Sequence, residues 1–243
     1  MGFLLGTLAN AILNRYCWAK PGSAIPTVYD GKSKLEMLFG TSVWEEFAGK
    51  TVIDFGCEFG NECRELQAHG AKRVIGLDIR PHILEIARQR SNEIEYAETT
   101  TEKADVILSL DSFEHYTDPA AVLKTMHELL APNGYVVVSF GPIWKHPHGG
   151  HGFSVFPWAH LLFSEAALIR WRNQFSTKPI SRFNEMDEGL NGMTIKKFIR
   201  FVESSPLKFK TLTIKPIRKA RWLHNRLTRE FLTSVIQCRL EHR

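Results

Sequence analysis

Cysteines are few in this chain, and no stretch of it is apolar enough to cross a membrane. The spacing of the four cysteines fits neither a zinc site nor a disulfide framework, so we expect a reducing, cytoplasmic location. The apolar N-terminus has no basic leading region, and Asn10 and Asn14 interrupt it before the ~20 apolar residues of a membrane span. We expect it to form a packed amphipathic helix, with peripheral contact to a membrane surface as the alternative.

Internal repeats and long low-complexity tracts are also missing, which excludes solenoids and long disordered tails. Hydrophobic residues make up 44% and charged residues 23% of the 243 residues, which are ordinary values for a globular protein with a sizeable core. We therefore expect a single domain over residues 1–243.

The net charge of +5 is unevenly distributed. Residues 206–243 carry ten Lys or Arg against two Glu, which leaves the rest of the chain at −3. A basic segment of this kind could meet nucleic acid, an anionic lipid surface or an acidic substrate. A solvated basic face is the commoner explanation, and the sequence leaves these alternatives open.

Short apolar runs alternate with helical patterns between Lys50 and Phe140. Strands are expected at 50–55, 73–78, 104–110 and 135–140, and helices at 61–69, 81–90 and 119–130. Continuous apolar strands separated by helices indicate a mostly parallel sheet covered on both faces, which is a doubly wound α/β fold. Ligands of such sheets bind beyond the carboxyl ends of the strands. Functional residues should therefore follow Phe55, Leu77, Leu110 and Phe140.

The flanking segments differ from this core in composition. Residues 1–47 are expected to form an N-terminal helical cap, with a helix to Tyr16, a break at Pro21-Gly22 and a helix over 33–47. Residues 141–205 begin with Gly, Pro, His and Trp, and helices are expected at 159–175 and 194–203. Residues 206–243 should supply two last strands, at 209–217 and 230–240.

A glycine loop joins the first strand to the first core helix. Gly56 and Gly60 permit a tight turn and a close approach of the backbone to a ligand. Asp78 ends the second strand, where a carboxylate can bind both hydroxyls of a ribose. A dinucleotide site would need Gly-x-Gly-x-x-Gly beside a pyrophosphate, and Glu58 inside this loop would repel that group. The same Glu58 tolerates a sulfonium or an amino group, so the pattern disfavours NAD.

Four ordered segments resemble the signatures of Rossmann-like S-adenosylmethionine-dependent methyltransferases, most of all the type 11 group related to the ubiquinone and menaquinone methyltransferases. These segments are 52–60, 74–78, 104–115 and 129–139, within a match from about Lys50 to Phe140. The resemblance implies a seven-stranded sheet with an antiparallel last strand and S-adenosylmethionine as the cofactor. It also implies that residues 48–140 are the cofactor-binding core, that 141–205 cover the substrate and that 206–243 are C-terminal strands.

The resemblance assigns roles to individual residues of the cofactor site. Asp54 opens the binding loop, and Gly56, Cys57 and Gly60 line the methionine half of the cofactor; Asp78 binds the ribose, Ile79 packs on the adenine and Leu110 lies near the methionyl amine. One position departs from the family pattern, because Glu58 replaces the middle glycine of the usual loop.

Histidines crowd the segment after the fourth expected strand. A carbon or hydroxyl acceptor needs a base to remove its proton, and histidine suits that role near neutral pH. The candidates are His146, His148 and His151, with His151 favoured because glycines surround it. A loop-ordering histidine bonded to a carbonyl is the alternative, and for His115 it is the stronger one. Three such imidazoles could bind zinc, but their spacing fits no helix face, so we expect no metal.

We therefore predict an enzyme that moves a methyl group from S-adenosylmethionine to an oxygen or carbon of a small molecule by in-line displacement. The aromatic residues between Phe153 and Phe175 favour a small acceptor, and nothing resembles the Asn-Pro-Pro-Tyr signature of nucleic-acid methyltransferases. Two alternatives remain: methylation of RNA or a lipid head group held by the basic C-terminal face, and a non-catalytic binding protein that keeps the cofactor fold. The oligomeric state is left open.

Overall fold

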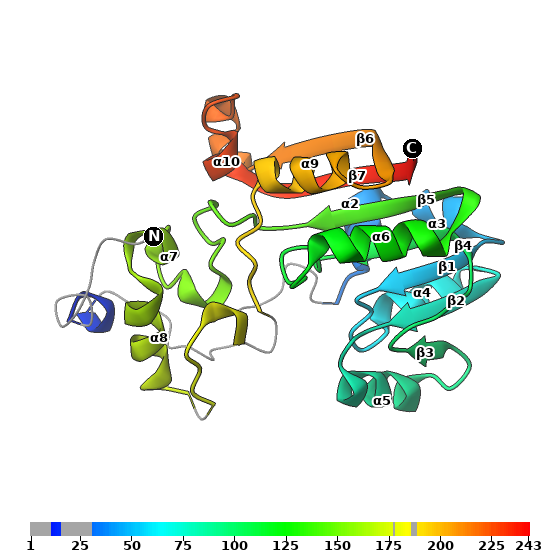
Figure 1. Cartoon of the computed structure of the whole chain (residues 1–243), viewed down its shortest axis with the longest axis horizontal. Coiled ribbons are helices and arrows are strands. Elements are labelled where there is room, and N and C mark those ends of the chain that lie inside the picture. Colours follow the sequence, from blue (N-terminus) through cyan, green and yellow to red (C-terminus); the bar gives the residue numbers. More distant parts are fainter. Residues whose placement is uncertain (1–10, 16–30, 177, 186–188) are drawn as a thin grey trace.

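The computed structural model describes residues 11–15, 31–176, 178–185 and 189–243. Its centre is a seven-stranded sheet in the order β3-β2-β1-β4-β5-β7-β6 (Figure 1). The parallel strands are β1 (Thr51–Phe55), β2 (Arg73–Leu77), β3 (Glu95–Ala97), β4 (Ala104–Leu110) and β5 (Leu130–Phe140). The last strand, β7 (Thr233–His242), runs antiparallel between β5 and β6 (Leu207–Pro216). The predicted doubly wound sheet with an antiparallel last strand is confirmed.

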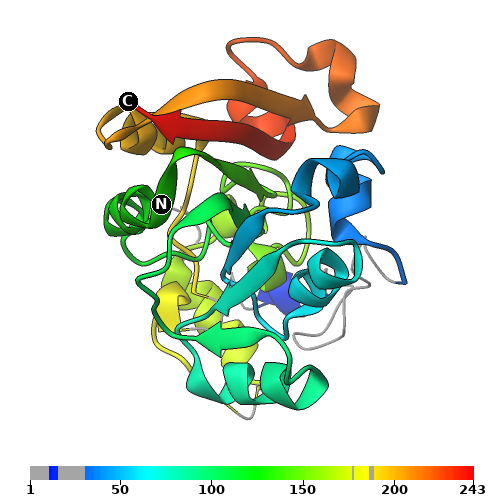
Figure 2. The same ribbon diagram turned by 90° about the vertical axis from the view of Figure 1, so that its right-hand side faces the viewer.

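Helices cover both faces of the sheet (Figure 2). One face packs against α6 (Pro119–Leu129) and α9 (Ile195–Glu203), and the other against α2 (Lys34–Phe39), α3 (Val43–Phe47), α4 (Asn61–Ala68) and α5 (Pro81–Arg90). Local sequence sets the helix starts: Pro81 and Pro119 occupy first turns, and the Asp118 carboxylate accepts bonds from the amides of Ala120 and Ala121. No helix of the described residues is long and apolar enough to cross a membrane.

Three expected elements differ in the structure. The helix expected over 33–47 is two helices, because Gly40 takes a left-handed φ of 83° between α2 and α3. The helix expected over 159–175 divides into α7 (Ala159–Leu162) and α8 (Glu165–Asn173), because Ser164 is extended and its side chain caps α8. The strand expected from Glu230 begins at Thr233, after the short helix α10 (Arg229–Leu232).

Two further outcomes concern short or terminal segments. The three-residue strand β3 was not predicted, because it is too short to show a periodic pattern. Of the first N-terminal stretch, residues 11–15 are helical, and the expected break at Pro21-Gly22 lies outside the described residues.

The carboxyl ends of the parallel strands meet at one edge of the sheet. Phe55 pairs with Leu77, and Leu110 pairs with Ser139, so the loops after β1, β2, β4 and β5 emerge side by side. Residues 141–176 and 178–185 lie beyond this edge (Figure 1). There α7, α8 and the short helices η1 (His151–Phe153) and η2 (Phe183–Glu185) pack in a separate cluster that includes Trp171. We call the edge where these loops emerge the carboxyl edge.

Candidate active site

The glycine loop folds back on the neighbouring strand. The amides of Gly56 and Cys57 donate to the carbonyl oxygen of Leu77 at 2.8 and 2.9 Å, which fixes the loop against the end of β2. Gly56 has a φ of 90°, and a Cβ there would stand 2.6 Å from the Ser112 hydroxyl. Glycine is therefore required both for the backbone turn and for contact with the loop after β4.

Glu58 also has a left-handed backbone, with a φ of 46°. This conformation is uncommon for a residue with a side chain, and it explains why the resembling family usually has glycine at this position. The amide of Glu58 donates to Asp78 Oδ2 at 3.2 Å, so the loop reaches the end of β2 despite the substitution.

Asp78, which the sequence predicts to bind the ribose, accepts several hydrogen bonds at the end of β2. The residue is only 6% exposed, and Oδ1 accepts from the backbone amide and Nε of Arg80 at 3.0 and 2.9 Å. Asp78 Oδ2 accepts from Arg80 Nη2 at 2.9 Å. The guanidinium thus presents two donors to one carboxylate, as a pair of ribose hydroxyls would. Beside this pair the side chain of Ile79 is 83% exposed, an unusual position for a branched apolar residue.

Acidic side chains surround the start of α4. The Asp54 carboxylate is buried and accepts a bond from the Cys63 thiol, with 3.4 Å between Sγ and Oδ2. Burial, reinforced by the charge of Glu62, raises the pKa of Asp54 to about 7. An added positive charge would favour the ionised form of this carboxyl, which matches a cationic ligand.

Lys34 is a residue of this site that the sequence did not indicate. Its Nζ lies 3.3 Å from Asp111 Oδ2 and 3.6 Å from Glu62 Oε1. Burial works against its charge, but Glu62, Asp111 and Asp54 together hold the pKa of Lys34 above its usual value. No local motif marks this lysine, because the fold brings its partners from distant parts of the chain.

The remaining predicted cofactor residues lie around the loop. Gly60 has a φ of 69° and is the N-cap of α4, packed against Tyr96. Cys57 and Leu110 are buried in the core cluster beneath the loop. The structure therefore brings all seven predicted cofactor residues to the carboxyl edge of β1, β2 and β4, where Ile79 is the most exposed of them.

The three histidines after β5 do not converge. His146 Nδ1 accepts a bond from the amide of His148 at 3.0 Å, while the His148 side chain is exposed. His160, which the sequence did not single out, is buried; its ring nitrogens lie 2.8 Å from the Ser154 hydroxyl and 2.5 Å from the Trp144 carbonyl oxygen. His146 and His160 therefore order the loop.

His151 instead lies with two residues from the loop after β4. One ligand atom each of Glu114, His115 and His151 lies within 4.8 Å of the others. Glu114 is 3% exposed, and its Oε1 accepts from the Gly141 amide at 3.3 Å. Glu114 Oε2 and His151 Nε2 are buried without a hydrogen-bond partner among the described residues. Such a set could hold a metal ion or move a proton.

Burial sets the protonation of this cluster. It lowers the pKa of His151 to about 4, with help from His115 and His160, so the imidazole is neutral at pH 7. Burial also raises the pKa of Glu114 to about 7. His115 Nδ1 lies 2.8 Å from the carbonyl oxygen of Gly189, which is the loop-ordering contact considered as the alternative for this histidine.

Asn191 joins the 141–193 segment to the loop after β4. Its side-chain amide donates to the carbonyl oxygens of Phe113 and Tyr116 at 2.7 and 2.9 Å. Its backbone amide donates to the Glu114 carbonyl oxygen at 3.0 Å. These bonds hold the loop that carries Glu114 in place.

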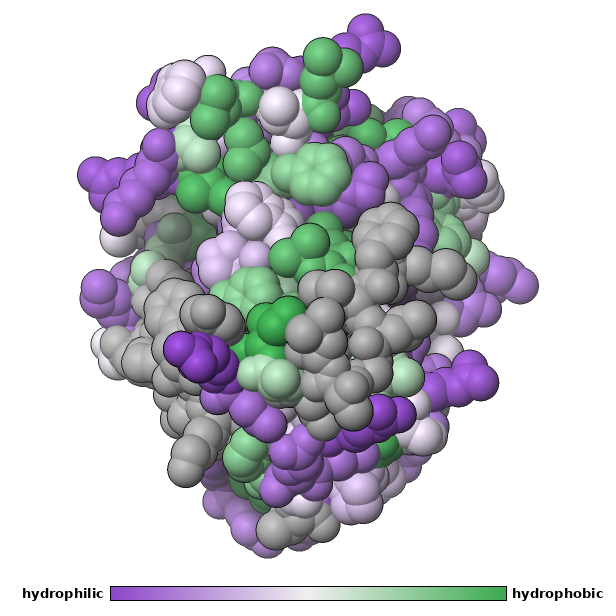
Figure 3. Space-filling view, turned by 90° about the vertical axis from the view of Figure 1, so that its left-hand side faces the viewer, coloured by the Kyte–Doolittle hydropathy of each residue, from purple (hydrophilic) through white to green (hydrophobic). Residues whose placement is uncertain are grey.

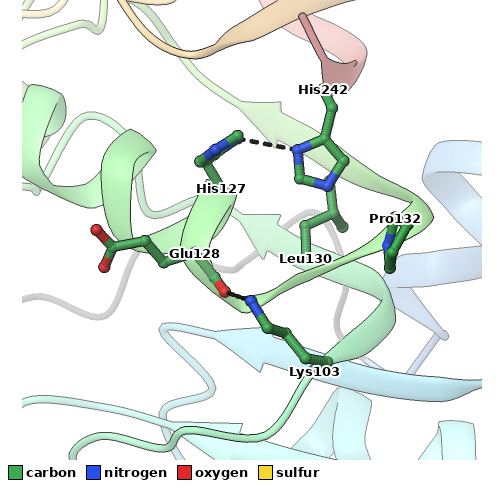
Figure 4. Close-up of a pocket in the computed structure, with 6 residues that line it drawn as sticks. All are labelled: Lys103, His127, Glu128, Leu130, Pro132 and His242. Atoms are coloured by element: carbon green, nitrogen blue, oxygen red, sulfur yellow. Dashed lines mark hydrogen bonds between the residues drawn. The ribbon is translucent and has the colours of Figure 1, made fainter.

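A hollow of about 370 Å³ lies at the opposite edge of the sheet, where β4 and β5 begin (Figure 4). There Nδ1 of His127 and Nδ1 of His242 are 2.9 Å apart, and Lys103 donates to the Glu128 carbonyl oxygen. None of the predicted site residues lines this hollow. The position of the strand ends therefore assigns the site to the carboxyl edge.

Comparison with known sequences identifies the family of the chain. A family model described as a methyltransferase domain matches residues 32–177. The ubiquinone biosynthesis O-methyltransferase of Neisseria meningitidis serogroup A is 31% identical over 168 residues, covering 63% of this chain and 65% of that protein. That of Pseudomonas paraeruginosa is 35% identical over 104 residues, covering 38% and 44%. The chain thus spans less than two thirds of the length of these curated relatives.

Solved structures share the fold. An S-adenosylmethionine-dependent methyltransferase from Mesorhizobium loti superposes with a TM-score of 0.52 at 19% identity, covering 82% of this chain and 93% of that one. The N-methyltransferase NodS from Bradyrhizobium japonicum, in complex with S-adenosyl-L-homocysteine, has a TM-score of 0.51 at 15% identity, covering 96% and 98%. With its family model matching more than half of its length, the chain belongs to the methyltransferase-domain family, and its fold is that of the Rossmann-like S-adenosylmethionine-dependent methyltransferases.

Proposed function

We propose that the protein transfers a methyl group from S-adenosylmethionine to an oxygen atom of a small molecule. The observation that carries the proposal is the buried pair of Glu114 and His151, whose unpartnered polar atoms lie at the same edge of the sheet as Asp54 and Asp78. An oxygen acceptor needs a base, and this pair supplies one. The curated relatives are named as O-methyltransferases, which agrees with that choice.

The residues at the glycine loop fit the cofactor by their chemistry. Carboxylates of Asp54, Glu62 and Asp111 suit a ligand with a sulfonium and an ammonium group, and Lys34 suits its carboxylate. Asp78 would hold the ribose once the Arg80 side chain turns away, and exposed Ile79 would cover the adenine. When bound, S-adenosylmethionine supplies an electrophilic methyl group.

The residues of the acceptor side would manage one proton. His151 Nε2 is neutral and unpartnered, so it can accept a hydrogen bond from an acceptor hydroxyl and relay its proton. Because burial lowers the pKa of His151 to about 4, the proton passes to Glu114, a member of the same cluster whose pKa is about 7, as the oxygen becomes a nucleophile. Residues 141–193 would exclude water above this pair.

An acceptor screen tests the proposal. Purified protein is incubated with methyl-labelled S-adenosylmethionine and a panel of phenols, catechols and small carboxylic acids, each compared with the matching amine or thiol. We expect labelled ethers from the phenols or catechols, and loss of label transfer in His151→Ala. Transfer confined to amines or thiols would reject the oxygen assignment while leaving the cofactor assignment intact.

A chelator separates the two uses of the cluster. If Glu114 and His151 act as a base, activity survives incubation with EDTA. Activity that disappears with EDTA and returns with Mg²⁺ or Zn²⁺ would instead assign the cluster to a metal ion, against the expectation from the sequence.

A further inference from the structure

An ordered excursion, residues 217–232, separates the two antiparallel strands at the edge of the sheet. It contains η3 (Arg218–Leu223) and α10, and it projects beyond the end of the β6–β7 ribbon (Figures 1 and 2). Its base is closed by the Ile217 amide, which donates to the Leu232 carbonyl oxygen at 2.8 Å. We call this segment the basic excursion.

The basic excursion exposes large apolar side chains. Trp222 is 82% and Leu227 88% exposed, and Leu223 and Phe231 are also exposed. Figure 3, which faces the carboxyl edge, shows apolar residues at the top of the molecule surrounded by hydrophilic ones. An exposed cluster of this kind, in contrast to scattered single residues, marks a surface that meets an apolar phase.

Hydrogen bonds hold the turn that presents these side chains. The amides of Leu227 and Thr228 donate to Asn225 Oδ1 at 2.9 and 3.3 Å, and the Asn225 amide donates to the Thr228 hydroxyl at 3.0 Å. The Thr228 hydroxyl in turn bonds the carbonyl oxygen of Leu223 at 2.5 Å. Leu227 is therefore held outward by a structured turn.

Cations alternate with the apolar residues. The excursion contains Arg218, Lys219, Arg221, Arg226 and Arg229 against one acidic residue, Glu230. Arg218, Lys219, Arg221 and Arg226 are exposed, and none of the four forms an ion pair with a described residue. Exposed tryptophan and leucine flanked by unpaired cations are complementary to an anionic bilayer surface, where the rings and chains enter the interface and the cations face phosphates.

The excursion also lies at the carboxyl edge. Because β5 and β6 both run antiparallel to β7, Pro216 ends β6 at the same edge at which Phe140 ends β5. The Lys145 ammonium, from the loop that follows β5, lies 5.4 Å from the centre of the Phe231 ring. The apolar surface is thus in contact with the segment that carries the histidines.

We propose that residues 217–232 dock the protein on an anionic membrane surface, with Trp222 and Leu227 inserted among the lipids. Docking in this orientation turns the carboxyl edge toward the bilayer. Membrane docking does not depend on the identity of the methyl acceptor, and it can be tested separately from catalysis.

Vesicle sedimentation of the full chain tests the proposal. Wild-type protein is mixed with vesicles of phosphatidylcholine alone or with 30% phosphatidylglycerol, and we expect binding at least ~10-fold stronger to the anionic vesicles, falling as salt rises. Trp222→Ser/Leu227→Ser should abolish most binding. Arg221→Gln/Arg226→Gln should weaken it by roughly 10- to 30-fold, from about 1 kcal/mol per cation near an anionic surface.

Control substitutions outside the basic excursion test whether vesicle binding depends on this segment. Lys72→Gln/Lys124→Gln removes two exposed cations elsewhere, and Leu212→Ser removes a partly exposed leucine from β6; both should bind vesicles like the wild type. Unchanged cofactor binding in every variant shows that the fold is kept. Three results would overturn the proposal: equal binding by the Trp222/Leu227 variant, a protein dimer that depends on these two residues without vesicle binding, or RNA binding that the arginines control without vesicle binding.

Discussion

The core of the sheet, residues 51–140, and the described part of residues 141–193 differ in how well sequence position predicts which residues meet. In the first, Asp54, Gly56 and Asp78 are far apart in the chain yet meet at one edge, because parallel strands deliver their carboxyl ends there. In the second, His146 and His148 contact each other, whereas His151, close to them in the chain, lies with Glu114 and His115. Position at a strand end predicts proximity; nearness within an irregular loop does not.

The carboxylates around the glycine loop differ from Glu114 in how their oxygens are satisfied. Around the glycine loop each carboxylate has a partner from the protein, such as Arg80 for Asp78 and Lys34 for Asp111. Where the loops after β4 and β5 meet, two buried atoms, Glu114 Oε2 and His151 Nε2, have none among the described residues. A buried polar atom without a partner is costly, so we infer that substrate or product meets these atoms during turnover.

The largest expected effect is on the catalytic side. His151→Ala should lower kcat by roughly 10²- to 10⁴-fold, the usual contribution of general acid–base catalysis, because His151 Nε2 is buried without a hydrogen-bond partner among the described residues and can relay the proton to Glu114. Affinity for S-adenosylmethionine, measured by calorimetry, should not change. His148→Ala, at an exposed position, is the control; an equal loss in that variant would remove the distinction between the two histidines.

Replacing Asp78 should weaken binding of S-adenosylmethionine. Asp78→Ala is expected to weaken S-adenosylmethionine binding by roughly 100-fold, since a hydrogen bond to a charged group contributes about 1.5–3 kcal/mol and the Glu58 amide also loses its acceptor. Calorimetric titration gives the dissociation constant. Glu95→Ala, an exposed carboxylate on the neighbouring strand β3, should bind normally. Normal binding by Asp78→Ala would show that the cofactor lies elsewhere.

The dependence of kcat/KM on pH should show the ionisation of Glu114. Because the pKa of this carboxyl is about 7 and the proton-accepting pair must be deprotonated, kcat/KM should rise as pH rises through 7. Glu114→Gln should lower activity and remove that step. An unchanged step in Glu114→Gln would assign it to another group.

The same carboxyl should affect folding in the opposite direction. Its pKa is about 7 in the folded protein against 4.5 for an exposed glutamate, so the folded state binds more protons between these values. Its contribution to stability is therefore lost as pH rises from about 4.5 to 7. Urea unfolding of wild type and Glu114→Gln across this range should show a smaller decline in the variant.

The smallest effect is expected at Arg80. Its guanidinium bonds both oxygens of Asp78, so it would compete with a ribose if Asp78 binds one as we propose. Arg80→Ala should bind S-adenosylmethionine about 2- to 5-fold more tightly, since a partly exposed ion pair contributes up to about 1 kcal/mol. Arg73→Ala serves as an exposed control. Weaker binding in Arg80→Ala would mean that the arginine contacts the cofactor itself.

The sheet was predictable because its strands are continuous apolar runs, and a parallel sheet fixes where their ends lie. The places of Gly56, Gly60 and Asp78 at the carboxyl edge could be predicted because each residue follows a strand or lies in the turn after one; their role in binding stays a prediction. Lys34 and Glu114 could not, since only tertiary packing brings Lys34 to Asp111 and Glu114 to His151. The helix breaks at Gly40 and Ser164 were not predicted, because the residues on both sides of each break follow a helical pattern.

We propose that the carboxyl edge of β1, β2 and β4 binds S-adenosylmethionine. Calorimetric titration of the purified protein with S-adenosylmethionine, with NAD as the control, tests it most directly. We expect saturable one-site binding in the micromolar range and no heat of binding with NAD. A protein that binds neither ligand, or binds NAD equally well, would contradict the account.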